Sequence, residues 1–204
     1  ERELILLRET EIWRDPLEKV KSNEKKGDEF TLTRAQESAL ANILSTFNPS
    51  TGSGQALQPS MPFLLYGITG SRKTEIYLRA AQETLKMGRQ ALILVPEIAL
   101  TPQTVRRFMS RFPGQVGILH SKLSDGERYD TWRRARSGQL SVLIGARSAL
   151  FTPFKNIGLI VLDECHDTSY YQSEPPFYHA VSAAEAYAKI CGATCLLGSA
   201  TPTV

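Results

Sequence analysis

The chain has 204 residues, of which 42% are hydrophobic and 22% charged, so it can bury a core and fold as a globular protein. The formal net charge of +3 permits a nucleic-acid partner without requiring one, and no apolar run is long enough to cross a bilayer. Cysteines 165, 191 and 195 are an odd, small set that indicates a reducing, intracellular setting. Their single C-x-x-x-C pair lacks the second pair of a structural zinc site, which favours buried free thiols.

The first part of the chain is polar. Residues 1–29 are charged and end in KSNEKKGD, so we expect a charged lead-in or linker that follows an N-terminal region outside this sequence. A helical pattern begins at LTRAQ and runs to about residue 47, with Thr31 or Thr33 as its N-cap. Residues 48–62 are rich in Pro, Ser and Gly, which predicts a flexible surface loop.

From residue 63 onward, short apolar runs alternate with longer amphipathic ones. The short runs predict buried strands at 63–66, 91–95, 116–119, 142–144, 159–162 and 194–197. The longer runs predict helices at 73–86, 101–112, 125–137 and 181–190. This alternation predicts an α/β fold with a mostly parallel central sheet that helices cover on both faces. Ligands of such sheets bind beyond the carboxyl ends of the strands, which is where the motifs described next lie.

The first predicted strand leads into a glycine-bearing turn, GITGSRKT, and then a helix; we call residues 67–74 the phosphate loop. Such loops bind polyphosphate through backbone N–H groups, and here Lys73 would reach the terminal phosphates while Thr74 would contact Mg²⁺. The pattern G-x-x-x-x-G-K-[ST] has glycine where this sequence has Arg72, whose Cβ hinders close approach and is expected to weaken ATP binding. The alternative is an ordinary strand-to-helix turn. The candidate nucleotide-binding residues of the loop are Gly67, Ile68, Thr69, Gly70, Ser71, Arg72, Lys73 and Thr74.

The predicted strand at 159–162 ends in DECH, which we call the acidic box. Two acids at the end of a buried strand are costly unless they meet a cation or solvent. With a phosphate loop upstream, Asp163 would hold Mg²⁺ and Glu164 would polarise the attacking water, so we predict that both act with Lys73 in catalysis. The alternative is a polar strand exit in an unrelated α/β protein. In the GSAT turn that follows the last strand, Ser199 and Thr201 could hydrogen-bond the acidic box and sense the γ-phosphate.

Together these motifs resemble superfamily-2 helicases and, within them, the PriA family of replication-restart helicases. The resemblance covers nearly all of residues 30–204 and rests on GITGSRKTEIY, LVPEIALTPQ, HSKLSDGER, IGARSALFTPF, DECHD and GSATP. It implies a three-layer RecA-like P-loop NTPase lobe, the first of two, in a DNA helicase that uses ATP and Mg²⁺. It further implies 3′-to-5′ unwinding at stalled or collapsed forks, primosome assembly and replication restart in the bacterial cytoplasm.

The resemblance also assigns roles to matching positions. Gln36, in LTRAQ, would lie on the adenine side of the nucleotide. The loops at 96–103 and 145–148 resemble those that touch single-stranded DNA, and the aromatic segment, residues 168–179 (TSYYQSEPPFYH), would link DNA contact to hydrolysis. The alternative for these aromatic side chains is a small satellite core under a loop. The candidate DNA-contact and coupling residues are Pro96, Thr101, Gln103, Arg147, Ser148, Tyr170, Tyr171, Phe177, Tyr178, Ser199 and Thr201.

Several parts of the family are expected outside this sequence. They are the second lobe with its arginine fingers, the N-terminal DNA-binding modules and a cysteine-rich zinc region. We therefore expect this chain by itself to show little or no DNA-stimulated ATPase and no unwinding activity. The implied partners are single-stranded and forked DNA, primosome proteins and single-strand-binding proteins. Cys165 stands where the family usually has a second glutamate, which leaves both predicted catalytic carboxylates in place.

Two other functions are compatible with parts of the sequence. One is a non-catalytic module that binds nucleotide or single-stranded DNA with a phosphate loop impaired by Arg72. The other is a different P-loop enzyme, such as a restriction-type or transport ATPase. The aromatic segment and GARSALF argue against that second possibility.

Overall fold

The computed structural model describes residues 14–17, 31–47, 61–68 and 70–201. Six parallel strands form a central sheet in the order β1-β8-β5-β2-β4-β3, and every neighbouring pair is parallel. The strands are β1 (Phe63–Tyr66), β2 (Gln90–Leu94), β3 (Val116–Leu119), β4 (Val142–Gly145), β5 (Ile157–Leu162) and β8 (Thr194–Ser199). The α/β fold with a parallel sheet is therefore confirmed.

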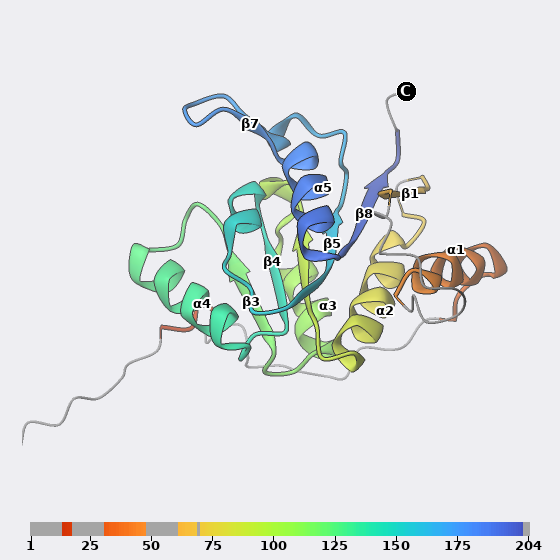
Figure 1. The fold of residues 1–204 in the computed structure, drawn as a ribbon, viewed down its shortest axis with the longest axis horizontal. Helices are drawn as coiled ribbons and strands as arrows, with labels where there is room; N and C mark the ends of the chain where they lie inside the picture. The colour runs from red at the N-terminus through yellow and green to blue at the C-terminus, as the bar shows by residue number, and fades with distance from the viewer. Residues whose placement is uncertain (1–13, 18–30, 48–60, 69, 202–204) are drawn as a thin grey trace, which may run out of the picture.

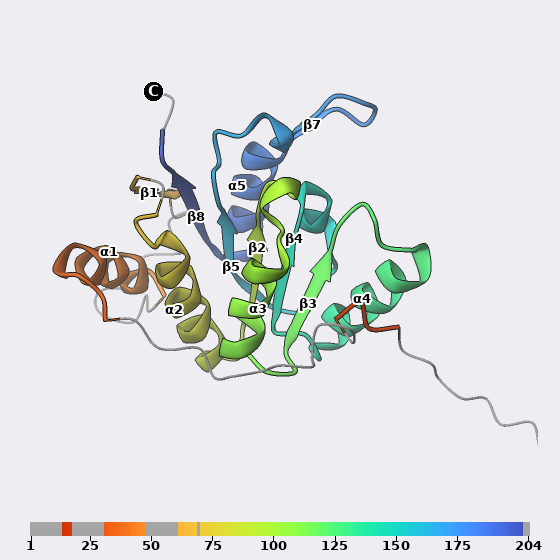
Figure 2. The same ribbon diagram turned by 180° about the vertical axis from the view of Figure 1, so that it is seen from behind.

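Helices cover both faces of this sheet, which gives three layers (Figures 1 and 2). One face packs against α1 (Arg34–Ser45), α2 (Lys73–Lys86) and α3 (Pro102–Arg111), and their apolar side chains form one core cluster. The other face packs against α5 (Ala180–Cys191) and the short 3₁₀ helix η3 (Arg147–Phe151). Beside the edge strand β3 lies α4 (Asp125–Ser137).

The helices begin and end close to the predicted positions. The predicted spans 73–86 and 125–137 are reproduced residue for residue, and those at 101–112 and 181–190 differ by one residue at each end. Of the two predicted N-caps, Thr33 is the one that caps α1. Its hydroxyl accepts from the Gln36 backbone N–H, while the Gln36 side chain accepts from the backbone of Thr33, which makes a capping box.

Two features of the β-structure differ from the sequence prediction. The prediction that β1 is buried is wrong: among the described strands β1 lies at the edge and pairs with β8 alone, and Leu64 and Tyr66 are exposed. The aromatic segment holds an unpredicted antiparallel hairpin of β6 (Tyr171–Gln172) and β7 (Tyr178–His179), preceded by the 3₁₀ helix η4 (Thr168–Tyr170). This hairpin projects from the same end of the molecule as the ends of β1 and β8 (Figure 1).

A short piece of the predicted lead-in packs on the lobe. The backbone N–H of Arg14 donates to Asp130 on α4 at 3.0 Å, and Arg134 of the same helix lies 3.5 Å from Asp15. Leu17 is buried in the core cluster of α1 to α3. Residues 14–17 are therefore docked, because a buried carboxylate and an apolar site hold them. The remainder of the predicted lead-in, and residues 48–60 of the predicted loop, lie outside the described residues.

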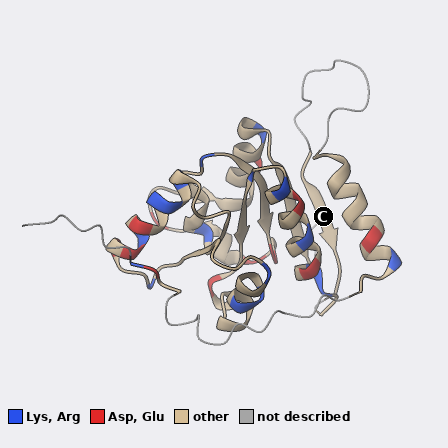
Figure 3. Cartoon of the chain, turned by 90° about the horizontal axis from the view of Figure 1, so that it is seen from below, with Lys and Arg blue, Asp and Glu red and all other residues tan. Residues whose placement is uncertain are grey.

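The described charged side chains and cysteines are spread over several elements of the lobe. Acidic and basic positions are interspersed along the helices when the chain is seen from below (Figure 3). The three cysteines are free thiols: Cys195 is buried as predicted, Cys165 is half-buried, and Cys191 at the end of α5 is exposed, so the prediction of a buried thiol is wrong for Cys191. In the described ranges no helix combines the length and apolarity that a membrane span needs.

Candidate functional site

Three predicted motifs follow the carboxyl ends of three neighbouring strands of the sheet. The phosphate loop follows β1, the GSAT turn ends β8 and the acidic box follows β5, in that spatial order. Backbone hydrogen bonds join them: Gly67 N–H donates to the Ser199 carbonyl at 3.1 Å, and Cys165 N–H donates to the Gly198 carbonyl at 2.8 Å. Because the carboxyl ends of parallel strands all lie on the same side of the sheet, residues far apart in sequence form one polar site.

Lys73 lies within the phosphate loop as the first residue of α2. Its ammonium group donates to the Gly67 carbonyl at 2.7 Å and lies 3.6 Å from a carboxylate oxygen of Glu164. The side chain is only 8% exposed, so it is held where a phosphate bound by the loop would meet it. Gln36 is tied to the same loop, because its amide donates to the Ser71 carbonyl at 2.8 Å. One predicted residue of the phosphate loop, Thr69, lies outside the described residues.

Arg72 has a left-handed backbone, with φ 59° and ψ 35°, at the N-cap of α2. Left-handed conformations cost a residue with a Cβ about 1 kcal/mol or more, whereas glycine adopts them freely. This is the position at which the P-loop pattern has glycine. The structure therefore gives a backbone reason, beside the steric one, for that preference.

Asp163 accepts two hydrogen bonds on the same carboxylate oxygen. The Tyr77 hydroxyl donates to Oδ1 at 2.9 Å, and the Glu164 backbone N–H donates to it at 3.1 Å. Burial raises the pKa of Asp163, and the hydrogen bond from Tyr77 opposes that rise. Burial and the neighbouring carboxylate raise the pKa of Tyr77, which therefore stays a hydrogen-bond donor.

Ser199 of the GSAT turn contacts the acidic box as predicted, whereas Thr201 bonds to Ser199 instead. Ser199 Oγ lies 2.9 Å from His166 Nδ1, and the Thr201 backbone N–H donates to Ser199 Oγ at 3.1 Å. His166 also lies 3.7 Å from Glu164. This chain of contacts leads from the last strand to the carboxylate predicted to activate water.

The donor set fits a nucleotide with Mg²⁺. In the described ranges, no three His, Cys, Asp or Glu side chains cluster so as to hold a metal ion by themselves. Mg²⁺ is typically bound through one or two carboxylates together with substrate phosphates, and keeps several waters. Asp163 Oδ2 has no donor among the described residues, so it is available as such a ligand. Thr74, the other predicted ligand, lies in the first turn of α2, and its hydroxyl would be the second protein group on such an ion.

A second group of predicted residues lies around a pocket beside the hairpin. The pocket has a volume of about 270 Å³, and it brings together three residues predicted to contact DNA, Arg147, Ser148 and Tyr178. Its other lining residues include Glu97, Ala146, Ser169 and Gln172 from the segments predicted to contact DNA, and Ser121 and Arg128 from outside those segments. Ser121 and Arg128 were not predicted to contact DNA, but both belong to HSKLSDGER, so the family motif carried a signal for them.

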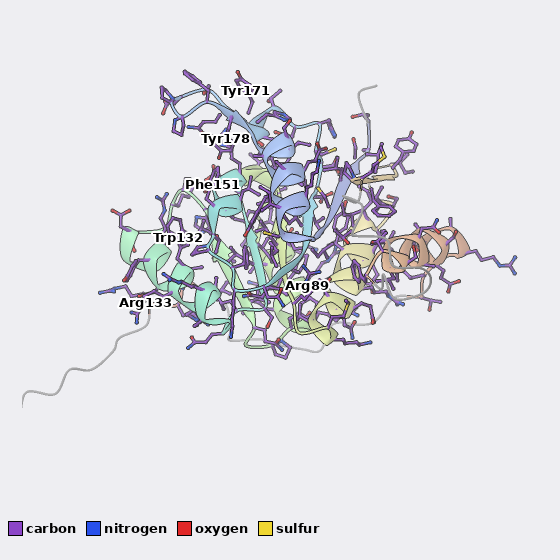
Figure 4. All side chains as sticks on the ribbon, viewed as in Figure 1. Arg89, Trp132, Arg133, Phe151, Tyr171 and Tyr178 are labelled. Carbon is purple, nitrogen blue, oxygen red and sulfur yellow. The ribbon has the colours of Figure 1, made fainter. Side chains whose placement is uncertain are left out.

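Arg147 fastens the aromatic segment to the end of β4. Its guanidinium donates to the Ser169 carbonyl at 2.9 Å and also to the Tyr171 carbonyl. Tyr178 packs edge-on against Phe151 of η3, with ring centroids 5.1 Å apart. Tyr171 lies above both rings in Figure 4. Tyr171 and Phe177 are 55% and 65% exposed, so both rings are open to a stacking partner.

Tyr170 differs from the other aromatic candidates because it is fully buried. Its hydroxyl lies 2.7 Å from the Asp163 carbonyl and 3.0 Å from the Leu94 carbonyl, at the ends of β5 and β2. The ring cannot stack on a base. It packs in a core under the loop, which was the alternative to DNA contact for these aromatic side chains. The hydroxyl nevertheless contacts the backbone of a predicted catalytic residue, which the sequence pattern did not indicate.

The remaining predicted DNA-contact residues lie after β2. Pro96 is buried and caps the 3₁₀ helix η2 (Glu97–Ala99). Thr101 caps α3 through its hydroxyl, which accepts from Thr104 N–H, and Gln103 is exposed in the first turn of α3. The structure thus puts them on the β2 side of the pocket, away from the phosphate loop on β1.

Comparisons with known proteins agree with this geometry. The family model of the DEAD/DEAH box helicases matches residues 33–204. The chain is 52% identical over 170 residues to replication restart protein PriA of Chlamydia pneumoniae. This alignment covers 83% of this chain and 22% of that protein. The chain is 44% identical over 201 residues to PriA of Bacillus subtilis (strain 168), covering 98% of this chain and 24% of the relative. The chain thus spans about a quarter of the length of these relatives.

Solved structures show the same fold. RecG, solved bound to a three-way DNA junction, superposes with a TM-score of 0.60 at 25% identity, covering 85% of this chain and 21% of that chain. The helicase domain of Hef from Pyrococcus furiosus superposes with a TM-score of 0.58 at 22% identity, covering 83% of this chain and 33% of that one. The sheet and its covering helices are those of a RecA-like helicase lobe.

Proposed function

Since this chain belongs to the DEAD/DEAH box helicase family and its curated relatives are PriA replication restart proteins, we propose that it is the ATP-binding lobe of an ATP-dependent DNA helicase. The observation that carries the proposal is the meeting of phosphate loop, acidic box and GSAT turn at adjacent strand ends. An ATPase site needs a phosphate cradle, a cation and a water-activating carboxylate within reach of one another. The contact of Lys73 with Glu164 supplies that proximity.

Each residue of the site has a chemical task in this proposal. Lys73 gives up its contact with the Gly67 carbonyl and binds the terminal phosphates, and Gln36 fixes the loop on the adenine side. Glu164 orients the attacking water, and Ser199 with His166 holds the acidic box against the GSAT turn. Bound Mg²⁺, held by Asp163 and Thr74, would neutralise phosphate charge during transfer.

The DNA side of the proposal rests on the pocket next to the hairpin. Exposed aromatic rings stack on unpaired bases regardless of sequence, and Tyr171 and Phe177 are suited to this. Arg147 connects that hairpin to the end of β4, while Tyr170 connects it to the backbone of Asp163. A base that shifts the hairpin would therefore act on the ATP site through Tyr170, whose hydroxyl contacts the Asp163 carbonyl. Exposed Ser148, Thr101 and Gln103 complete the proposed DNA side, whereas Pro96, also predicted to contact DNA, is buried at the start of η2.

The finer biological assignment follows the relatives. PriA is named for replication restart, and we extend to this chain action at stalled or collapsed forks, 3′-to-5′ unwinding and primosome assembly. Single-stranded and forked DNA, primosome proteins and single-strand-binding proteins are the proposed partners, in the bacterial cytoplasm. A second RecA-like lobe would supply arginine to the γ-phosphate, and the family's zinc region would lie beyond it.

The left-handed backbone of Arg72 favours a second candidate, a nucleotide- or DNA-binding module without turnover. A nucleotide titration separates the two. Mg²⁺-dependent ATP binding that Asp163→Asn abolishes supports the helicase lobe. Binding of single-stranded DNA that ATP does not affect supports the module.

A chimera tests the function itself. In it, this chain replaces the matching segment of Bacillus subtilis PriA, to which it aligns over 201 residues. We expect the chimera to unwind forked DNA with ATP, and Glu164→Gln to abolish unwinding while DNA binding persists. Glu83→Gln, on the exposed face of α2, serves as the control. A folded, DNA-binding chimera whose unwinding is the same with Glu164→Gln would contradict the proposal.

A further inference from the structure

Tyr77 is a buried tyrosine whose hydroxyl is directed at a predicted metal ligand. It lies one turn into α2, and its side chain is only 1% exposed. Its hydroxyl donates to Asp163 Oδ1 at 2.9 Å, across 86 residues of sequence. Oδ1 also accepts the Glu164 backbone N–H, so both of its bonds come from the protein and Oδ2 faces no described donor. The rotation of the carboxylate is thereby fixed.

Gly198 of the GSAT turn leaves the space that this hydroxyl occupies. A Cβ built at Gly198 would lie 1.8 Å from the Tyr77 hydroxyl oxygen and 2.9 Å from its ring carbon, far inside contact distance. It would also come within 3.2 Å of Asp163 Oδ1. The helix after the phosphate loop, the acidic box and the GSAT turn therefore meet at this one hydroxyl.

We propose that Tyr77 is a positioning residue for Mg²⁺: by holding Asp163 Oδ1, it presents Oδ2 to the ion that accompanies ATP. The proposal rests on the proposed function, because it requires that the lobe binds Mg²⁺ with ATP. Groups that hydrogen-bond a metal ligand fix its orientation, and their loss typically lowers metal affinity about 10- to 100-fold. A tyrosine that served packing alone would need its ring and no particular partner for its hydroxyl.

The test measures ATP binding to the chain by calorimetry over a series of Mg²⁺ concentrations and, separately, with EDTA. For Tyr77→Phe we expect the half-saturating Mg²⁺ concentration to rise about tenfold while ATP affinity in EDTA stays unchanged. Tyr187→Phe, a tyrosine of α5 on the opposite face of the sheet, is the matched control and should behave as wild type. A thermal melt without Mg²⁺ establishes that each variant is folded.

Gly198→Ala provides an independent variant. Its methyl group displaces the Tyr77 hydroxyl, so the same rise in Mg²⁺ requirement is expected, and the double variant should be no worse than Gly198→Ala alone. Additive effects of the two changes would overturn the proposal, as would wild-type Mg²⁺ dependence in Tyr77→Phe or an equal loss of ATP affinity with and without Mg²⁺. A wild-type chain without Mg²⁺-dependent ATP binding would instead overturn the proposed function, and this inference with it.

Discussion

Arg72 places a long side chain at a left-handed position of the phosphate loop (φ 59°). The strain and the bulk both come from having a Cβ there, whereas the guanidinium brings a charge that phosphate attracts. Backbone and charge therefore act in opposite directions on nucleotide binding. Substitutions that separate them show which one dominates.

We predict that Arg72→Gly raises ATP affinity and stabilises the chain by about 1 kcal/mol, because glycine adopts this backbone without strain. Arg72→Ala keeps the Cβ and loses the charge, so it should not regain affinity. Nucleotide titration and urea denaturation of the three proteins provide the measurement. Equal ATP affinity in wild type and Arg72→Gly would refute the argument.

Tyr170→Phe removes a buried hydroxyl from two strand-end carbonyls, those of Leu94 and Asp163. We expect a loss of stability of about 1 kcal/mol, because the carbonyl oxygens lose a donor in a place that water does not reach. Urea denaturation measures it. Tyr129→Phe is the control, because that ring is 62% exposed and the change should have little effect. Equal losses in the two variants would contradict the assignment.

Among the elements, the hairpin β6–β7 depends on contacts outside itself, because strands of two residues have little stability of their own. Arg147 provides such a contact by donating to the Ser169 and Tyr171 carbonyls. The hairpin also carries the exposed rings proposed to stack on DNA. Its position and its affinity for DNA should therefore depend on the same arginine.

Arg147→Ala is predicted to increase amide hydrogen exchange in residues 168–179 and to weaken binding of single-stranded DNA. Arg133→Ala, on α4, removes an arginine that lies over the Tyr129 ring and is the control for lost charge. Hydrogen exchange and a fluorescence titration with labelled oligonucleotide measure both effects. Unchanged exchange in the hairpin would refute the role of Arg147 as its anchor.

The elements predicted correctly from the sequence are those whose burial produces a regular pattern of apolar residues. The strands β2 to β5 are buried on both faces, so each is a continuous apolar run, and the helices between them have clear caps. β1 has the same kind of apolar run, yet Leu64 and Tyr66 are exposed, whereas β3 at the opposite edge of the sheet is buried. Which edge strand is covered depends on tertiary packing and leaves no local signal. The two-residue strands of the hairpin are too short for any periodicity.

At the scale of the whole molecule, the sheet assembles a site that motif chemistry had largely predicted. Lys73, Asp163 and Glu164 meet as expected, because phosphate and metal chemistry demands those residue types at strand ends. Tyr77 was missed because it lies on the apolar face of α2 and matches the pattern of a core residue. The burial of Tyr170 likewise depends on how β2 and β5 lie side by side.

The chain by itself is predicted to show little or no DNA-stimulated ATP hydrolysis. In related phosphoryl-transfer enzymes an arginine at the γ-phosphate accelerates turnover on the order of 10³-fold or more, and we propose that this arginine lies on a second lobe. A phosphate-release assay with and without single-stranded DNA is the measurement. Strong DNA stimulation in the isolated chain would contradict the two-lobe account.

The claim that this lobe binds ATP through its phosphate loop is tested most directly by calorimetric titration of Mg²⁺-ATP into wild type, Lys73→Ala and Lys86→Ala. Both lysines lie on α2, but Lys73 is buried against Glu164 whereas Lys86 is exposed. We predict that Lys73→Ala weakens binding by about 2 kcal/mol or more, which exceeds tenfold, and that Lys86→Ala binds as wild type does. Equal affinity in the two lysine variants would contradict the account.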